Sequence, residues 1–208
     1  YTGFKEKSVL INGSGIDLKN FPKIKLKKSE KVNLLICSRV IPSKGFMELF
    51  KALIHLDNLG LNNFVVVVAG EFNEKRVSKE FCRLFSKCLE LDQFSYLGYC
   101  ENTRDLLSES HIALLPSYRE GLSRFLLEAC ATGRALLTTD VAGCRDLVLE
   151  GRNGMLCRPR DVSSLVNGIK NFLELPFSKL EKMGAESRKI VDPKFSEFKV
   201  VMDYVNVL

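Results

Sequence analysis

The sequence predicts an α/β fold, a Rossmann-like doubly wound parallel sheet of about six strands with helices on both faces. Short runs such as 32–38, 64–69 and 112–115 are almost wholly apolar, as expected of strands that are buried on both faces. Segments with apolar residues at helical spacing alternate with these runs; Phe46, Leu49, Phe50 and Leu53 give the first. Strands that alternate with helices predict a parallel sheet covered by its crossover helices.

The remaining elements continue this alternation along one domain, residues 1–208. A short apolar run at 8–12 and a glycine-rich turn at 12–17 come first, and a lysine-rich connector covers 19–31. Gly143 is expected to open a short helical turn. Six strands in this arrangement fit the order 3-2-1-4-5-6. Further strands are expected at 94–97, 135–139 and 155–157, and further helices at 77–88, 102–109, 123–132, 162–172, 177–190 and 195–207.

Composition excludes several classes of protein. The chain is 46% hydrophobic, enough for a packed core, yet no apolar run reaches the length of a membrane span. Seven cysteines occur without a Cys-x-x-Cys pair, which favours reduced thiols in a cytoplasmic protein. The two histidines, His55 and His111, are far apart in the chain, which argues against a histidine zinc site or a Ser/His/Asp triad. No Asp-x-Asp occurs, so we expect no metal ion.

The net charge of +6 is modest, and we expect no nucleic-acid partner. Lysines nevertheless cluster in the connector, at positions 23, 25, 27, 28 and 31. Such a run is usually a solvated linker, and the alternative is that it faces an anionic surface. The sequence leaves both interpretations open.

The stretch 117–133 organises the chain, because it reads as a loop and a helix that follow a buried strand. Pro116 ends the strand, since proline has no N–H for the ladder, and Ser123 is a suitable N-cap for the helix. Glu120 lies in the loop just outside the helix N-terminus, next to Gly121, and Glu128 lies inside the helix. A carboxylate beside a free helix N-terminus is well placed to hold a sugar hydroxyl or part of an anionic ligand.

The predicted topology brings a second loop to the same place. Strands 32–38 and 112–115 are neighbours across the switch point, where open α/β sheets bind ligands at the carboxyl ends of their strands. The loop with Arg39 and Lys44 should therefore face the loop with Glu120 and Gly121. Cations and a helix N-terminus suit a diphosphate, and carboxylates suit sugar hydroxyls. A nucleoside diphosphate sugar carries both groups.

At this point the motifs match a family. The chain resembles the C-terminal, donor-binding domain of retaining glycosyltransferases of family 4, which have the two-domain GT-B architecture. Glu120 and Glu128 reproduce the family's Glu-x7-Glu spacing. The other matching segments are 12–17 (NGSGID), 38–45 (SRVIPSKG), 69–71 (AGE), 97–99 (LGY), 115–117 (LPS), 119–122 (REGL), 128–129 (EA) and 151–154 (GRNG).

The resemblance implies three catalytic residues. Arg39 and Lys44 would bind the donor diphosphate and stabilise charge on the leaving group, Arg through a planar fork and Lys as a compact charge. Glu120 would bind hydroxyls of the donor sugar. No nucleophilic carboxylate is assigned, and the usual family proposal is a front-face route in which the diphosphate helps to deprotonate the acceptor.

The resemblance also implies four donor-binding residues. Gly121 and Leu122 would offer backbone N–H groups to phosphate and sugar, and Glu128 would hold the ribose hydroxyls. Tyr99 would meet the base, or would simply pack on the sheet. Two departures from the family pattern, Phe72 for a glycine and Arg134 for a proline, put the identity of base and sugar in doubt.

The reaction implied is transfer of a hexosyl group with retention of configuration. Family frequency favours a UDP-sugar, with GDP and ADP open, and a saccharide or lipid-linked saccharide as acceptor in surface polysaccharide synthesis. No cofactor is implied. Peripheral association of the full-length protein with the inner face of the membrane is left open. Because the chain begins at Tyr1 and the family's N-terminal acceptor domain is absent, we expect a fragment that binds nucleotide but transfers no sugar alone.

That missing domain would leave part of the closing helix exposed, along the face with Phe195, Phe198, Val201, Met202 and Val205. Two alternatives to a transferase remain. A nucleotide-sugar epimerase of GT-B type would lack the Glu-x7-Glu pair, which disfavours it. A non-catalytic nucleotide-binding module is the other. An NAD site is excluded because 38–45 contains one glycine and not Gly-x-Gly-x-x-Gly.

Overall fold

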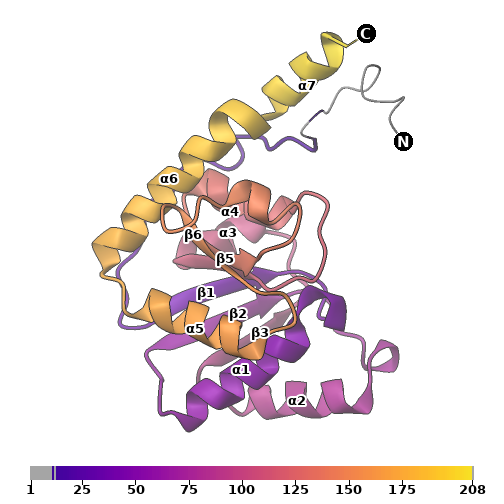
Figure 1. Ribbon diagram of the computed structural model, residues 1–208, viewed down its shortest axis with the longest axis vertical. Coiled ribbons are helices and arrows are strands. Elements are labelled where there is room, and N and C mark those ends of the chain that lie inside the picture. The colour runs from indigo at the N-terminus through magenta and orange to yellow at the C-terminus, as the bar shows by residue number, and fades with distance from the viewer. Residues whose placement is uncertain (1–10, 12, 208) are drawn as a thin grey trace.

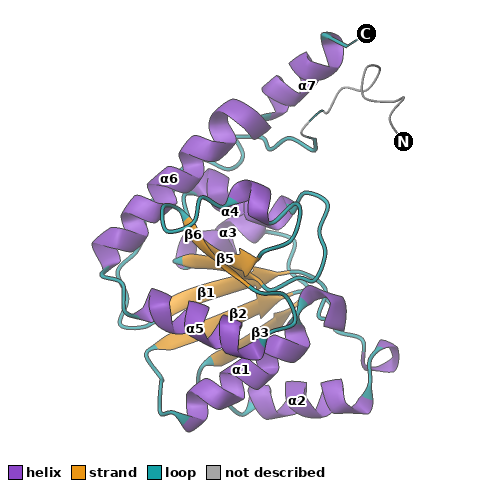
Figure 2. Cartoon of the chain, in the orientation of Figure 1, coloured by secondary structure: helices purple, strands orange, loops and turns teal. Residues whose placement is uncertain are grey.

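The computed structural model describes residues 11 and 13–207, and the predicted apolar run at 8–12 therefore lies almost wholly outside the described residues. The described chain forms a six-stranded, fully parallel sheet in the order β3-β2-β1-β4-β5-β6 (Figures 1 and 2), which confirms the predicted fold class and strand order. The strands are β1 (Val32–Cys37), β2 (Phe64–Ala69), β3 (Phe94–Gly98), β4 (Ile112–Leu115), β5 (Ala135–Thr139) and β6 (Gly154–Cys157).

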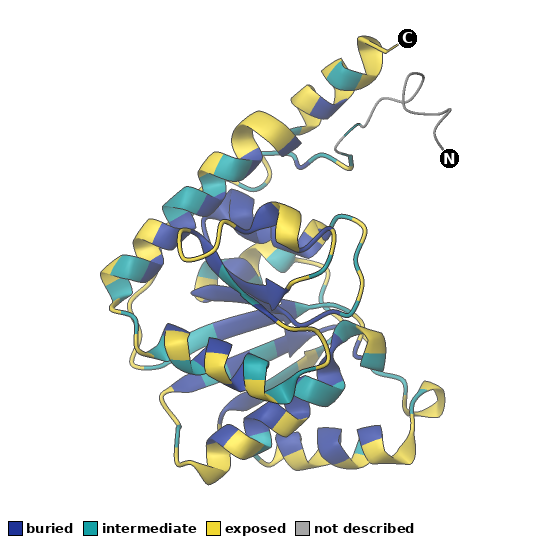
Figure 3. Ribbon diagram, viewed as in Figure 1, coloured by how far each residue is buried: buried dark blue, intermediate teal, exposed yellow. Residues whose placement is uncertain are grey.

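Helices cover both faces of the sheet, and each face has its own core. One core joins α1, α2 and α5 to the sheet, and the other joins α3, α4 and α6. The neighbouring strands β4 and β5 are buried along their whole length (Figure 3), β4 with an unbroken apolar sequence and β5 with two threonines at its carboxyl end. The helices are α1 (Phe46–Asn58), α2 (Lys79–Leu89), α3 (Thr103–Glu109), α4 (Arg124–Thr132), α5 (Val162–Leu173), α6 (Phe177–Phe195) and α7 (Glu197–Val205).

Local signals in the sequence fix the bounds of α4. The Ser123 side chain accepts a hydrogen bond from the backbone N–H of Leu126, which confirms Ser123 as the N-cap. Gly133 ends the helix with a φ of 78°, in the left-handed region that glycine adopts at least cost. The helical turn expected near Gly143 is a short 3-10 segment, Arg145–Leu147.

The two closing helices differ from the prediction at their junction. Helix α6 runs to Phe195, and Ser196 then caps α7, so the break comes later than expected. Phe195 is only 4% exposed and packs in the second core, so its predicted place on an exposed face is wrong. Helix α7 projects beyond the sheet (Figures 1 and 3), and Phe198, Val201, Met202 and Val205 are exposed as predicted.

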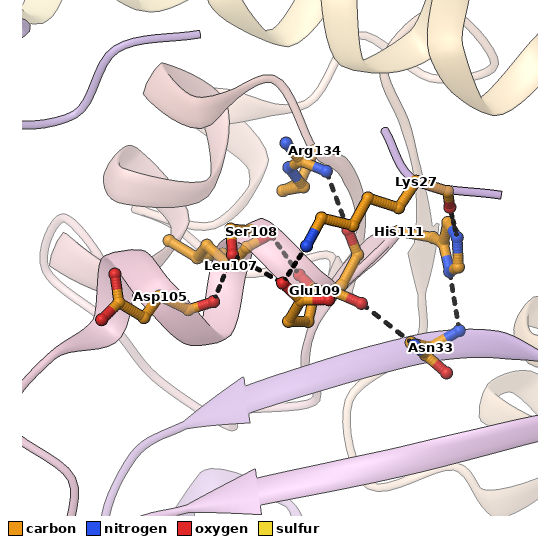
Figure 4. Close-up of polar contacts among 9 residues, drawn as sticks. Lys27, Asn33, Asp105, Leu107, Ser108, Glu109, His111 and Arg134 are labelled. Carbon is orange, nitrogen blue, oxygen red and sulfur yellow. Dashed lines mark hydrogen bonds and ion pairs between the residues drawn. The ribbon is translucent and has the colours of Figure 1, made fainter. Parts of the chain in front are cut away.

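The lysine-rich connector has no helix or strand over residues 21–31, but its backbone is fixed to the amino edge of the sheet. The Ile24 N–H donates to the Thr132 carbonyl, and the Leu26 side chain is 7% exposed. His111 links this segment to β1, because its Nδ1 accepts from the Asn33 N–H and its Nε2 contacts the Lys27 carbonyl oxygen at 2.7 Å (Figure 4). Lys23, Lys25, Lys27 and Lys28 are exposed, as a solvated face requires.

Arg134 is fully buried at the same edge, shown in Figure 4 beside this network. Its terminal nitrogens donate to the carbonyl oxygens of Ser110 at 2.9 Å, Ile24 at 2.5 Å and Thr132 at 3.1 Å. The other departure from the family pattern, Phe72, packs its ring against Phe85 with centroids 4.4 Å apart. Neither side chain lines the two pockets at the carboxyl ends of β1 and β4 that are described below.

None of the helices in the described part of the chain combines the length and apolarity needed to cross a membrane.

Candidate functional site

The two loops singled out from the sequence lie against each other at the carboxyl ends of β1 and β4. The backbone N–H of Tyr118 donates to the Ser43 carbonyl oxygen at 2.9 Å, and the Ser117 hydroxyl donates to the same oxygen at 3.2 Å. Gly45 makes this approach possible, because its φ is 79° and an added Cβ would lie 1.9 Å from the Pro116 carbonyl oxygen. The predicted convergence of the two loops is therefore present in the structure.

A basic and an acidic side chain meet where these loops touch. Lys44 Nζ lies 2.5 Å from Glu120 Oε1, and the two side chains are 22% and 12% exposed. Arg39 is exposed and lines the same pocket, which has a volume of about 270 Å³. The other lining residues are Cys37, Ser38, Leu115, Leu122, Ser123, Arg124 and Phe125. Arg39, Lys44 and Glu120 thus share one crevice, as the topology predicted.

The acidic loop is held from its other side by Gly143. Gly143 has a φ of 78°, and an added Cβ would lie 1.5 Å from the Gly121 carbonyl oxygen. Gly121 itself is exposed, and neither its N–H nor that of Leu122 donates to any group in the described part of the chain. These two N–H groups precede the free N-terminus of α4, a location that favours anionic ligands.

A second pocket, of about 430 Å³, adjoins the first. It contains Glu128 and Tyr99, and it shares Cys37, Arg124 and Phe125 with the smaller pocket. Tyr99 is 75% exposed, so the alternative that it merely packs on the sheet is wrong. The seven residues expected from the sequence therefore fall into two adjoining parts of one crevice: a charged part with Arg39, Lys44, Glu120 and Leu122, beside Gly121, and a second part with Tyr99 and Glu128.

Glu128 is the buried carboxylate of this crevice, at 6% exposure. Burial raises its pKa above the ordinary value, and a hydrogen bond from Arg124 acts in the opposite direction. Arg124 Nε donates to Glu128 Oε1 at 3.0 Å. The Glu128 carboxylate can therefore accept a hydrogen bond from a neutral hydroxyl group or pair with a cation.

The crevice suits binding and charge stabilisation more than nucleophilic attack by a thiol. Burial raises the pKa of the Cys37 thiol to about 12, so this cysteine stays protonated at neutral pH. Within residues 11 and 13–207, no group of three or more His, Cys, Asp or Glu side chains is arranged to hold a metal ion. The groups aimed into the crevice are cations, carboxylates and backbone N–H groups.

Sequence reasoning missed Arg124. Its signal was present, since Arg124 precedes Glu128 by one helical turn and such pairs face each other. A larger hollow of about 900 Å³ lies between residues 11–21 and α7, and it meets the crevice through Arg124. This hollow contains no pair of cations beside a helix N-terminus, so we take the charged crevice as the candidate site.

A doubly wound sheet of this order, with its charged crevice at the switch point, has the architecture of one half of a GT-B glycosyltransferase. The chain belongs to the family described as glycosyl transferases group 1, whose family model matches residues 17–190. The narrower expectations of family 4 and of retaining chemistry remain predictions.

Curated relatives are transferases of this kind. The chain is 29% identical over 185 residues to N,N'-diacetylbacillosaminyl-diphospho-undecaprenol alpha-1,3-N-acetylgalactosaminyltransferase of Campylobacter jejuni, covering 83% of this chain and 47% of that protein. It is 27% identical over 191 residues to glycogen synthase of Mycobacterium tuberculosis, covering 90% of this chain and 45% of that protein. The chain therefore spans about half the length of the curated relatives it matches.

Solved structures share the fold. Anabaena HepE in complex with UDP and glucose superposes with a TM-score of 0.77 at 20% identity, over 92% of this chain and 54% of that one. The C-terminal domain of a group 1 family protein, LpcC from Francisella tularensis, superposes with a TM-score of 0.70 at 19% identity, over 88% of this chain and 99% of that one.

Proposed function

We propose that this chain is the donor-binding domain of a retaining glycosyltransferase that takes a nucleoside diphosphate sugar. One observation carries the proposal: Arg39, Lys44 and Glu120 line one pocket, which opens into a second pocket containing Glu128 and Tyr99. Ligand sites commonly measure about 300–1,000 Å³. The two adjoining volumes, about 270 and 430 Å³, suit a ligand with a charged end and a nucleoside end.

Each group has a role in this proposal. Arg39 and Lys44 bind the diphosphate and stabilise the charge that develops on it as the glycosyl bond breaks. Glu120 and the N–H groups of Gly121 and Leu122 hold the sugar and its phosphate. Glu128 accepts hydrogen bonds from the ribose hydroxyls, and Tyr99 covers the base. The Lys44–Glu120 ion pair must loosen as the donor enters, because Lys44 then shares its charge with phosphate.

The reaction we propose is transfer of a hexosyl group on the face from which the nucleoside diphosphate leaves. The glycosyl bond to the diphosphate breaks, the acceptor hydroxyl bonds to the same carbon, and its proton passes to the departing phosphate oxygen. No cofactor takes part in this scheme. The acceptor would be held by a further domain, and this chain alone would bind nucleotide without transferring sugar.

We favour a UDP-sugar as donor and a saccharide or lipid-linked saccharide as acceptor, for synthesis of surface polysaccharide or glycan in the cytoplasm. Support comes from similar proteins: HepE was solved with UDP and glucose, and the name of the Campylobacter jejuni relative includes a diphospho-undecaprenol. These similarities support a nucleoside diphosphate sugar as the class of donor, and the proposal therefore also includes GDP- and ADP-sugars.

The lysine-rich connector supports peripheral association with an anionic membrane face. Residues 19–31 hold six lysines and one glutamate, a net charge of +5 out of +6 for the whole chain. The side chains alternate, with Lys23, Lys25 and Lys27 exposed and Leu26 buried. A row of lysines on one side of an extended segment suits a sheet of anionic headgroups. Vesicles with and without anionic phospholipid test this by co-sedimentation, and equal binding to both would refute it.

Calorimetric titration of this chain with UDP, GDP and ADP tests the donor site. We expect one nucleotide to bind below the millimolar range, with the other two weaker. If none binds in that range, the assignment of the crevice is wrong. Tight nucleotide binding by a full-length protein that neither transfers nor hydrolyses any sugar nucleotide would instead favour the non-catalytic module.

A further inference from the structure

Arg124 occupies a special position in the crevice. It is the first residue of α4, and among the hollows of the described chain it is the one residue that lines both parts of the crevice and the larger hollow beside α7. Its side chain is 79% exposed, whereas that of its partner Glu128 is 7% exposed. The pair is therefore asymmetric: a solvated cation reaches inward to hold a buried carboxylate.

The contact between them is single and directional. Arg124 donates through Nε to one carboxylate oxygen, Glu128 Oε1, at 3.0 Å. The terminal nitrogens of Arg124 make no hydrogen bond to the residues that the structure describes, and the Thr103 side chain also lies within hydrogen-bonding reach of the Glu128 carboxylate. One carboxylate oxygen is thus fixed by the protein, and Glu128 lines the pocket in which we place the nucleoside.

We propose that Arg124 is the positioning residue for Glu128: it fixes Oε1 and keeps the carboxylate turned so that Oε2 receives the ribose hydroxyls. This inference rests on the proposed function, because it assigns the ribose to the pocket that contains Glu128. It differs from an ordinary exposed helical pair, which contributes little to stability and would leave ligand binding unchanged.

Physical reasons favour the positioning role. A carboxylate with so little exposure loses most of its hydration, so without a charged partner it either takes up a proton or turns toward water. A protonated carboxyl accepts hydrogen bonds poorly, and a turned one no longer meets both hydroxyls of a ribose. Arg124 prevents both changes with one contact, and it approaches from the rim, so it does not fill the nucleoside pocket.

The Thr103 side chain also faces the Glu128 carboxylate, but it carries no charge, so Arg124 is the charged partner of Glu128 in this pocket. Arg104 is the other cation lining the pocket, and its Nε lies 3.9 Å from Asp105. The remaining groups bring no positive charge. The titratable side chains lining the pocket with Glu128 are Cys37 from β1, Tyr99, Cys100, Glu101 and Arg104 from the segment between β3 and α3, and Arg124 from α4 itself.

The test compares the affinities of this chain for UDP and for 2′,3′-dideoxy-UDP, which lacks both hydroxyls. Wild type should prefer UDP by about 10- to 100-fold, the range expected for hydrogen bonds to a charged group. Arg124→Met removes the charge and keeps the length of the side chain. It should lower this preference at least fivefold, and taking the ratio of the two affinities removes any loss of attraction for the diphosphate that both nucleotides share. Arg124→Lys should restore part of the preference.

Two further measurements separate positioning from a structural role. In a Glu128→Gln background, Arg124→Met should have no further effect on the ratio, because the residue it positions has been changed. Arg124→Met removes a contact that lowers the pKa of Glu128, so the UDP preference of this variant should increase as the pH rises and should depend on pH more than that of wild type. Urea midpoints close to that of wild type show that each variant is folded.

The outcomes are distinct. If wild type prefers UDP and Arg124→Met keeps the full preference, Arg124 is no positioning residue and the proposed function stands. If wild type binds both nucleotides equally, the ribose role of Glu128 fails as well, and the fault lies in the proposed function. If Arg124→Met lowers the preference for UDP by the same factor in the Glu128→Gln background as in wild type, Arg124 acts on the ligand without Glu128, which also overturns the inference.

Discussion

Replacing Lys44 by alanine should weaken binding of UDP to this chain by about 10- to 100-fold. Lys44 Nζ lies in the charged pocket, and its side chain keeps only 22% of its exposure, so water screens it weakly. A hydrogen bond to a charged group contributes about 1.5–3 kcal/mol, and about 1.4 kcal/mol corresponds to a tenfold change in affinity. The smaller energy, about 1.5 kcal/mol, gives the lower bound of about a tenfold loss of affinity.

The same substitution should act on the free protein. Glu120, 12% exposed, would lose the partner that lies 2.5 Å away. Leaving a partly buried carboxylate unpaired should lower the free energy of unfolding by about 1–2 kcal/mol, near the lower end of the range for buried groups because some water reaches it. The unpaired Glu120 would also repel an incoming diphosphate, which adds to the loss of affinity.

Isothermal titration calorimetry and urea unfolding measure the two effects. Lys51→Ala is a matched control, since Lys51 lies on α1, is about half exposed and approaches Glu80 only to 3.6 Å. That control should change neither quantity appreciably. If wild type binds UDP and Lys44→Ala binds it within twofold of wild type, Lys44 plays no part in holding the diphosphate and the reasoning from the pocket fails.

Three other substitutions probe the scaffold. Gly45→Ala places a Cβ 1.9 Å from the Pro116 carbonyl oxygen at a φ of 79°. The free energy of unfolding should fall by more than the cost of about 1–2 kcal/mol that is typical of a left-handed residue, and UDP binding should be lost. Arg134→Met leaves the Ser110 and Ile24 carbonyl groups without their donor, and the free energy of unfolding should fall by about 2–4 kcal/mol with UDP affinity unchanged. Burial lowers the pKa of His111 below its ordinary value of 6.5, so the folded state resists protonation of this side chain. The free energy of unfolding of wild type should therefore fall as the pH drops below 6.5, and that of His111→Gln should fall less.

Each of these has its own check. Gly60→Ala is the control for Gly45→Ala, because Gly60 has a φ of 73° with nothing within 4 Å of an added Cβ. Equal losses of stability in the two variants would mean that the contact with Pro116 is unimportant. Weakened nucleotide binding in Arg134→Met would contradict our placement of Arg134 at the far edge of the sheet. Parallel urea midpoints for wild type and His111→Gln from pH 7 to 5 would exclude His111 as the source of the pH dependence.

The sequence by itself determined the sheet, its strand order and the loops that form the crevice. Uniformly apolar runs indicate strands that are buried on both faces, and helical periodicity indicates helices with one buried face. Strands buried on both faces and separated by helices predict a parallel sheet. Once β1 and β4 are neighbours, the loops that follow them must lie at one edge of the sheet. Ser123 could likewise be assigned, since an N-cap depends on the backbone of its own turn.

Only the tertiary structure decided which side chains touch. Lys44 and Glu120 are 76 positions apart, and their contact depends on how closely Gly45 and Pro116 approach, which no local periodicity reports. Arg134 could not be placed from its charge, because a buried guanidinium satisfied by carbonyl groups contradicts the usual exposure of arginine. Sequence patterns record the environment of each segment one at a time, whereas a site is a set of distances between segments.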